Sequence, residues 1–322
     1  MNFYTDPQWA YAEANDTSRR DEPMEIGDWS ATAHLNSLYR QLRELGLESN
    51  IAELDAMGFT ILENLLPQET VIRARNVILK LCEDRTGIKP DLDTGEGLED
   101  WRLIPYLLVR DPVFEEILMN DKSLALSTYL LGAGLQLSSM TCHLKGPSER
   151  GQLGLHSDTP MLDPLPPYSN VININYALVD YTREGGCLAI VPGSHKLARA
   201  PLPSETSLLP GHENPNAIPL EIPAGSAVIW HGNTWHGSYP RTIPGLRLNL
   251  AQYMARPWMK LQERYGRELP QEIIDRHKDD PRFAQLVGLN DTMGWQEEGP
   301  SFLNPVNALE PGAVKRTDMR QR

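Results

Sequence analysis

The sequence is poor in cysteine and in basic residues, and each shortage excludes a class of protein. The three cysteines, Cys82, Cys142 and Cys187, are widely separated, and none belongs to a Cys-x-x-Cys pair. They indicate buried, reduced thiols rather than a disulfide framework. The formal net charge is −13 and no basic stripe is present, which argues against nucleic acid as a partner.

Long apolar runs are also missing. No stretch approaches the roughly 18 consecutive apolar residues of a membrane-spanning helix, and the first residues lack the basic and apolar pattern of a signal peptide. We therefore expect a cytoplasmic protein without membrane association. Hydrophobic residues make up 40% of the 322 residues, which is enough for a folded chain with a substantial core.

The spacing of apolar residues divides the chain into an arm and one domain of three parts. Residues 1–33 are polar and without periodicity, so we expect an N-terminal arm. We expect a single domain over 34–322, with a mostly helical part at 34–134, a β-rich core at about 135–257 and a helical extension at 258–322.

The β-rich part consists of short runs separated by glycine and proline. The runs read QLSSMTCHL, VININYALV, CLAIV, SAVIW and RLNLAQYM. Enrichment in β-branched and aromatic residues predicts strands. Their number and spacing indicate an antiparallel sandwich or barrel, of which the jelly roll with its cupin relatives is one form.

Potential metal ligands occur in two places. His156 and Asp158 lie two residues apart, so on a strand both side chains point to the same face. About 80 residues later the run WHGNTWHGS supplies His231 and His236. Two imidazoles and one carboxylate leave three coordination positions free, the arrangement typical of non-haem Fe(II) oxygenases. Spacing alone leaves open which later histidine is the ligand.

Arg247 lies eleven residues beyond His236, among apolar neighbours on a predicted strand. An inward-facing arginine needs a partner, and its planar group suits a carboxylate. No acidic partner is apparent in the sequence, so the carboxylate of a ligand is one candidate. The alternative is an outward arginine on a half-exposed strand.

Several segments together resemble the phytanoyl-CoA dioxygenase family of Fe(II)/2-oxoglutarate oxygenases. The resemblance covers roughly residues 53–257 and rests on ELDAMGFTILENLL, LLGAGLQL, HSD, DYTREGGCL, IVPGSHK, WHGS and the following arginine. It implies a mostly β core with flanking helices, folded as a double-stranded β-helix (a cupin-like jelly roll). It also implies that the 34–322 domain is an oxygenase.

The resemblance further implies a set of site residues. His156, Asp158 and His236 would hold Fe(II), and Arg247 would bind the distal carboxylate of 2-oxoglutarate, with O2 as the second co-substrate. His236 is favoured over His231 because its spacing to Arg247 and the Gly-Ser that follows match the family.

Four further polar residues lie on predicted strands where they could contact 2-oxoglutarate. They are Thr141, His143, Asn173 and Asn175. The two asparagines share one strand face. The alternative for them is hydrogen bonding to backbone within the barrel.

The function implied is a dioxygenase that hydroxylates, or otherwise oxidises, a C–H bond and releases succinate and CO2. The apolar, proline-rich segment 161–168 favours a small, apolar natural-product or lipid-like substrate. An acyl-CoA hydroxylase of the same family, a zinc-dependent hydrolase and a non-catalytic cupin-like binding module are the alternatives. Asp158 argues against halogenation, which requires a small residue at that position. The sequence leaves the oligomeric state open, a homodimer included.

Overall fold

The structure is a computed structural model. It describes residues 35–98, 103–148, 151–159, 162–289, 295–296 and 299–300. The expected arm at 1–33 lies outside the described residues, as does much of the expected extension beyond residue 289.

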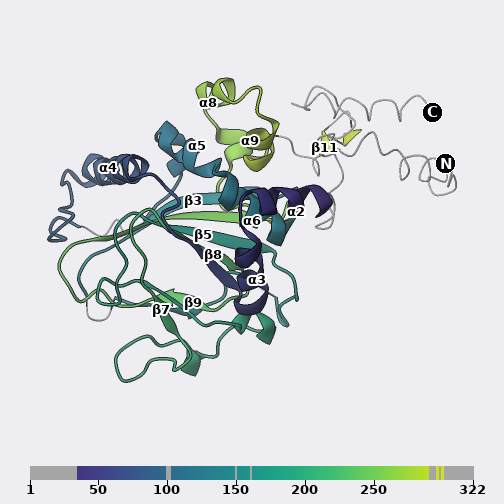
Figure 1. The fold of residues 1–322 in the computed structure, drawn as a ribbon. Helices are drawn as coiled ribbons and strands as arrows, with labels where there is room; N and C mark the ends of the chain where they lie inside the picture. The colour runs from purple at the N-terminus through teal and green to yellow at the C-terminus, as the bar shows by residue number, and fades with distance from the viewer. Residues whose placement is uncertain are drawn as a thin grey trace, which may run out of the picture.

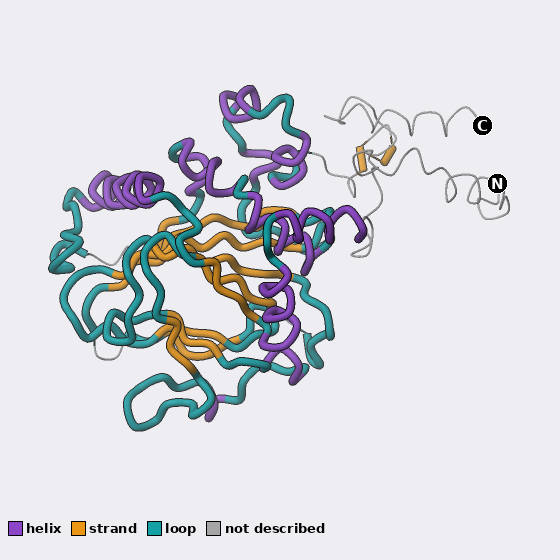
Figure 2. Tube along the Cα trace, in the orientation of Figure 1, coloured by secondary structure: helices purple, strands orange, loops and turns teal. Residues whose placement is uncertain are grey.

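Two antiparallel sheets form the core and lie one above the other (Figures 1 and 2). The larger sheet has six strands, in the order β1 (Phe59–Leu62), β8 (Ala227–His231), β5 (Val171–Ala177), β10 (Arg247–Ala255), β3 (Gln136–Lys145) and β2 (Leu103–Ile104). The smaller sheet has the order β4 (Leu153–His156), β9 (His236–Ser238), β6 (Leu188–Ile190) and β7 (Ile218–Leu220). The predicted double-stranded β-helix with flanking helices is confirmed.

The helices are α2 (Leu35–Glu44), α3 (Glu48–Met57), α4 (Gln68–Thr86), α5 (Pro112–Leu118), α6 (Asp121–Leu131), α7 (Tyr265–Glu268), α8 (Gln271–Arg276) and α9 (Pro281–Leu286). Most of them gather on the side of the larger sheet that faces away from the smaller one, whereas α3 runs beside the edge of the two sheets (Figures 1 and 2). Short 3₁₀ helices lie at η2 (Leu107–Val109), η3 (Ser194–Leu197) and η4 (Pro203–Glu205), and β11 (Trp295–Gln296) pairs with β12 (Gly299–Pro300).

Two apolar clusters hold these layers together. The larger cluster joins the helices to the outer face of the six-stranded sheet, and it contains Cys82 and Cys142. The smaller cluster joins the inner face of the larger sheet to the four-stranded sheet, and it contains Cys187 and Trp230. All three cysteines are free and buried, as predicted.

The segment expected to be helical also contributes strands to the larger sheet. The run at 59–62 forms β1 and pairs with β8, with Phe59 opposite Trp230. Residues 103–104 form β2 beside β3. Runs of two to four residues are too short to show a period, so their pairing is decided by the neighbouring strand.

None of the helices in the described part of the chain combines the length and apolar character that a bilayer-spanning segment needs.

Candidate metal centre and its cavity

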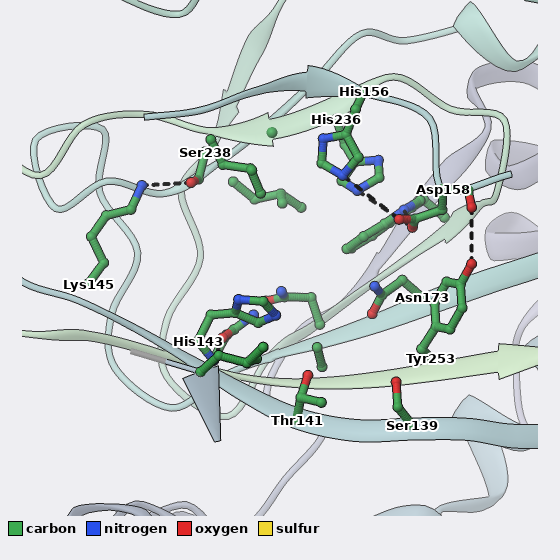
Figure 3. A pocket seen from close by; sticks show the side chains of 18 of the residues that line it. Ser139, Thr141, His143, Lys145, His156, Asp158, Asn173, His236, Ser238 and Tyr253 are labelled. Atoms are coloured by element: carbon green, nitrogen blue, oxygen red, sulfur yellow. Dashed lines mark hydrogen bonds and ion pairs between the residues drawn. The ribbon is translucent and has the colours of Figure 1, made fainter. Parts of the chain in front are cut away.

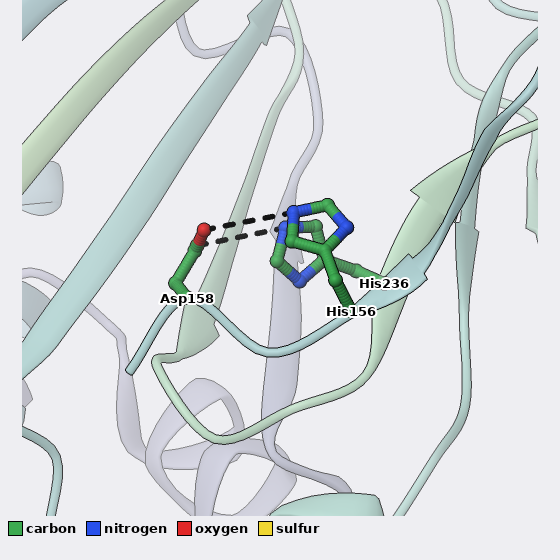
Figure 4. Close-up of side chains that lie close together, drawn as sticks. All are labelled: His156, Asp158 and His236. Atoms are coloured by element: carbon green, nitrogen blue, oxygen red, sulfur yellow. Dashed lines mark ion pairs between the residues drawn. The ribbon is translucent and has the colours of Figure 1, made fainter. Parts of the chain in front are cut away.

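The three predicted metal ligands come together where β4 meets β9. His156 ends β4, His236 begins β9, and the two are paired in register. Asp158 follows in the turn after β4. Its carboxylate oxygens lie 3.8 Å from His156 Nε2 and 3.5 Å from His236 Nε2 (Figure 4). One ligand atom from each residue lies within 4.8 Å of the others, so a single ion can contact all three.

The orientation of both imidazoles suits metal binding. His156 Nδ1 lies 3.0 Å from the carbonyl oxygen of Gly154, and His236 Nδ1 lies 3.0 Å from that of Thr234. A carbonyl only accepts hydrogen bonds, so each Nδ1 carries the proton and each Nε2 presents a lone pair to the ion. Burial lowers the pKa of His236 to about 4, which keeps this ring neutral at pH 7.

Asp158 is held by groups from the larger sheet and from a turn. Trp230 Nε1 donates to Asp158 Oδ2 at 3.0 Å, and the Tyr253 hydroxyl donates to the Asp158 backbone oxygen at 3.0 Å. The backbone N–H of Asp158 donates to the oxygen of Gly232 at 2.9 Å. Such contacts fix the direction of a metal-binding carboxylate, so the donor set fits a divalent ion with a face left open.

His231 is used differently from His236. The Nδ1 atom of its ring accepts a hydrogen bond from the backbone N–H of Asn233, and the backbone N–H of His231 donates to the oxygen of Gly58. Its ring lies 5.4 Å from the ring of His195. A Cβ at Gly58, where φ is +83°, would lie 2.4 Å from His195 Nδ1. His231 and His195 therefore pack the turn between α3 and β1 against the β8–β9 turn.

A cavity of about 660 Å³ opens beneath the three ligands. Its floor is the larger sheet, where alternate residues of a strand face the same side. The floor residues are Ser139, Thr141, His143 and Lys145 of β3, Asn173 and Asn175 of β5, and Arg247, Asn249, Ala251 and Tyr253 of β10. All eight residues proposed from the sequence as ligands of the metal or of 2-oxoglutarate thus line one cavity. Figure 3 labels them except Asn175 and Arg247.

Cross-strand register arranges the floor in rows. Arg247 lies opposite Lys145 at one end. Ala251 lies between Thr141 and Asn175, and Tyr253 lies between Ser139 and Asn173. We call Lys145 and Arg247 the cationic row. Thr141, Asn175 and Ala251 form the middle row, and Ser139, Asn173 and Tyr253 form the far row. Six residues of strand separate the cationic from the far row, about 20 Å at 3.3 Å per residue.

The cationic row has no acidic partner. The Arg247 guanidinium lies 4.7 Å from the centre of the Tyr181 ring, and its Nε makes no hydrogen bond. Lys145 Nζ donates to Ser238 Oγ at 2.6 Å and to the oxygen of Tyr239 at 2.8 Å. Among the described residues no carboxylate forms an ion pair with either cation. Burial, reinforced by Arg247, lowers the pKa of Lys145 to about 7.

The other residues predicted to contact 2-oxoglutarate differ in whether their side chains already make hydrogen bonds within the protein. Asn175 Oδ1 accepts a hydrogen bond from the Tyr181 hydroxyl at 2.9 Å. Asn173 Oδ1 is buried and has no partner. Burial and the nearby Arg247 lower the pKa of His143 to about 4. Neither asparagine side chain bonds to backbone within the described part of the chain, which was the alternative reading.

Sequence reasoning missed the facing direction of Lys145 and the supporting roles of Trp230 and Tyr253. The alternation that marks Thr141 and His143 continues to Lys145, and that signal was available in the sequence. The hydrogen bonds of Trp230 and Tyr253 to Asp158 join residues 72 and 95 positions apart, and no local pattern reports such contacts.

Comparison with known proteins gives consistent matches. Residues 54–247 match the phytanoyl-CoA dioxygenase (PhyH) family. Dioxygenase af480 of Aspergillus fumigatus is 27% identical over 188 residues, covering 58% of this chain and 58% of that protein. Phytanoyl-CoA dioxygenase 1 of rice is 28% identical over 151 residues, covering 45% of this chain and 53% of that protein. The chain thus spans a little over half the length of these two relatives.

Among solved structures, HygX from Streptomyces hygroscopicus with nickel and 2-oxoglutarate bound superposes with a TM-score of 0.55. The two chains are 20% identical, and the match covers 66% of this chain and 88% of HygX. At this identity the likeness concerns the fold.

Proposed function

The chain belongs to the phytanoyl-CoA dioxygenase family of non-haem iron, 2-oxoglutarate-dependent oxygenases, and we propose that it couples 2-oxoglutarate decarboxylation to oxidation of a small-molecule C–H bond at the cavity described above. The observation that carries this proposal is the position of Arg247, an unpaired buried cation at the end of the cavity that also holds the metal ligands. A metal site alone would fit many reactions. A guanidinium group that can bind a carboxylate is expected only where the co-substrate is an acid.

In this proposal His156, Asp158 and His236 hold Fe(II), which supplies the activation of O2 and the oxidative decarboxylation of 2-oxoglutarate to succinate and CO2. The protein's own part is orientation. Trp230 and Tyr253 fix Asp158, and the backbone carbonyls behind both imidazoles fix their Nε2 atoms. Burial of the site limits water around the reacting groups.

Arg247 would hold the distal carboxylate of 2-oxoglutarate. Its guanidinium offers two parallel N–H groups in the geometry of a carboxylate. Lys145, opposite Arg247 in register, adds a second positive charge while it is protonated. His143 and Asn175 line the floor between this end and the metal ligands, where the middle of the co-substrate would lie.

The substrate itself is proposed to be a small molecule. HygX, whose fold is similar, was solved with nickel, 2-oxoglutarate and hygromycin B bound. The described residues of the segment expected to form an apolar wall, 162–168, do not line the cavity. Lys145 turns inward to Ser238, which leaves it unsuited to the phosphates of coenzyme A. We therefore favour a natural-product substrate over an acyl-CoA.

Succinate formation tests the proposal. Protein loaded anaerobically with Fe(II) should convert 2-oxoglutarate to succinate on exposure to O2, even when the oxidisable substrate is absent. His156→Ala should lower this rate by about 1,000-fold or more, since it removes a ligand from the assembled centre. A zinc hydrolase or a binding module would take up metal and yield no succinate; that result with wild-type protein would refute the proposal.

A further inference from the structure

We propose that the far row of the cavity, Ser139, Asn173 and Tyr253, binds the oxidisable substrate by hydrogen bonds, so that the substrate carries several uncharged hydroxyl or amide groups. This inference rests on the proposed function and names the substrate class for the same site. It replaces the expectation, drawn from the sequence, that Asn173 contacts 2-oxoglutarate and that the substrate is apolar.

The first step is the reach of the co-substrate. 2-Oxoglutarate has five carbons in a chain, and four C–C bonds of about 1.5 Å span at most roughly 6 Å. With its distal carboxylate at Arg247, it covers the floor near the cationic row and extends to the metal ligands. The backbone of the far row lies about 20 Å along the strand from that of Arg247, so a co-substrate that runs from Arg247 to the metal leaves the floor beyond the metal for another molecule.

The second step is the unmet hydrogen bonding of Asn173. Its Oδ1 is buried without a partner, and its Nδ2 donates no hydrogen bond within the described part of the chain. The neighbouring Asn175, which shares its strand face, is engaged by Tyr181. A buried polar group without a partner costs about 1–3 kcal/mol. An apolar substrate would leave that cost in place, whereas a hydroxyl or amide removes it.

The third step is the charge of the surroundings. Among the described residues that line the cavity, the positively charged Lys145 and Arg247 lie in the cationic row and Asp158 faces the metal. The far row itself is neutral, and Ser139 bonds to Gln262 at the rim, Oγ to Oε1 at 2.5 Å. The oxygens of the neighbouring Asp158 face His156 and His236, so a charged substrate group would find no free counter-ion among the described lining residues of the far row, which favours uncharged polar groups.

The fourth step is proximity to the reaction centre. Tyr253 of the far row donates to the backbone of Asp158, and Asn173 is paired in register with Trp230, which donates to the Asp158 carboxylate. Figure 3 shows Asn173 and Tyr253 on the Asp158 side of the cavity, opposite Lys145. A molecule held by the far row therefore places its own C–H bonds beside the metal position.

The experiment measures probe binding rather than turnover. Full-length protein is loaded with Zn(II), which is diamagnetic and redox-inert, and with 2-oxoglutarate. Dissociation constants for cyclohexanol and myo-inositol, two six-membered carbon rings with one and six hydroxyl groups, are then measured by NMR titration. We expect inositol to bind about tenfold or more tightly than cyclohexanol, one net hydrogen bond or more.

Variants link this preference to the far row. Asn173→Leu keeps the side-chain shape and should weaken inositol binding about tenfold, while 2-oxoglutarate affinity changes less than twofold. Ser139→Ala, a smaller change, should weaken inositol binding in the same direction. Asn216→Leu makes the same replacement on an exposed loop away from the cavity and serves as the control, with no effect on either ligand.

Each other outcome has a defined meaning. Equal or tighter binding of cyclohexanol, or no probe binding by protein that binds 2-oxoglutarate, overturns the inference. Equal losses of inositol and 2-oxoglutarate affinity in Asn173→Leu return Asn173 to the co-substrate site and overturn it as well. Failure of the wild type to bind 2-oxoglutarate counts against the proposed function instead, and the probe preference can still be read with Zn(II) alone.

Discussion

The two ends of the cavity are built on the same three strands, yet they differ in charge and in what they leave unpaired. At one end Lys145 and Arg247 face each other, and no carboxylate of the described residues forms an ion pair with either. At the other end Ser139, Asn173 and Tyr253 are neutral, and Asn173 Oδ1 has no hydrogen-bond partner among the residues that the structure describes. The metal ligands lie over the floor, with Asp158 on the side of Asn173 and Tyr253 and opposite Lys145 (Figure 3).

This difference divides one cavity into two sites. Two neighbouring cations, of which Arg247 is buried and Lys145 half-buried, are costly to keep without an anion, and in the proposed function the cationic row therefore binds a carboxylate. An unpaired neutral amide is arranged for a neutral polar group. In the proposed function, a metal held beside the far row would be reached by 2-oxoglutarate from the cationic row and by the oxidisable substrate from the far row.

The largest expected effect comes from removing Arg247, the side chain proposed to bind the distal carboxylate. Arg247→Ala should weaken 2-oxoglutarate binding by about 100-fold or more, since two charge-assisted hydrogen bonds of about 1.5–3 kcal/mol each are lost. The measurement is the dissociation constant for 2-oxoglutarate with metal bound. 2-Oxopentanoate, which lacks the distal carboxylate, should bind the variant and the wild type equally. If both ligands lost affinity alike, Arg247 would be acting on the fold and not on the carboxylate.

The sequence was informative where chemistry follows a local period or a compact motif. His156 and Asp158 lie on one strand face by alternation, and the distance from His236 to Arg247 pointed to the correct later histidine for the cluster. The strand runs from 135 to 257 match β3, β5, β6, β8 and β10. These features depend on residues near one another in the chain, or on a resemblance that carries their spacing.

Features that depend on cross-strand register could not be predicted from the sequence. Asn173 and Asn175 lie on the same strand face, so alternation cannot distinguish them. The Tyr181 hydroxyl, brought in by the turn after β5, donates a hydrogen bond to Asn175 and not to Asn173. The pairing of Lys145 with Arg247 joins residues on β3 and β10 that are 102 positions apart by their numbers. Register of this kind depends on packing of the whole sheet.

Trp230→Phe tests whether the hydrogen bond from Trp230 to Asp158, at the far-row end of the cavity, contributes to metal affinity. The substitution keeps an aromatic ring but removes the donor to Asp158 Oδ2. Loss of such support lowers metal affinity by about 10- to 100-fold. Fe(II) or Mn(II) titration measures this, and 2-oxoglutarate affinity at saturating metal should be unchanged. An unchanged metal affinity would show that the neighbouring backbone contacts alone orient Asp158.

Lys145→Met should weaken 2-oxoglutarate binding about tenfold at pH 6, since one hydrogen bond to a charged group is lost. The pKa of Lys145 is lowered to about 7, so the wild-type lysine is charged below that pH and neutral above it. Affinity of the wild type should therefore fall as pH rises through 7, by at most about tenfold per pH unit.

The control for this pH dependence is the variant itself. Lys145→Met should show a flat dependence between pH 6 and 9, and Lys145→Arg should keep tight binding across the range because arginine stays protonated. A wild-type profile that matches the methionine variant would mean that Lys145 stays bonded to Ser238 and Tyr239 and does not contact the carboxylate.

The smallest expected effect belongs to the far row. Tyr253→Phe removes the hydroxyl that donates to the Asp158 backbone oxygen, which should lower the free energy of unfolding by about 1 kcal/mol. Denaturant unfolding measures that loss. Its 2-oxoglutarate affinity should stay within twofold of the wild type, because the ring lies six strand residues from Arg247. A loss comparable to that of Lys145→Met would show that the two ends act as one site, and the division of the cavity would have to be abandoned.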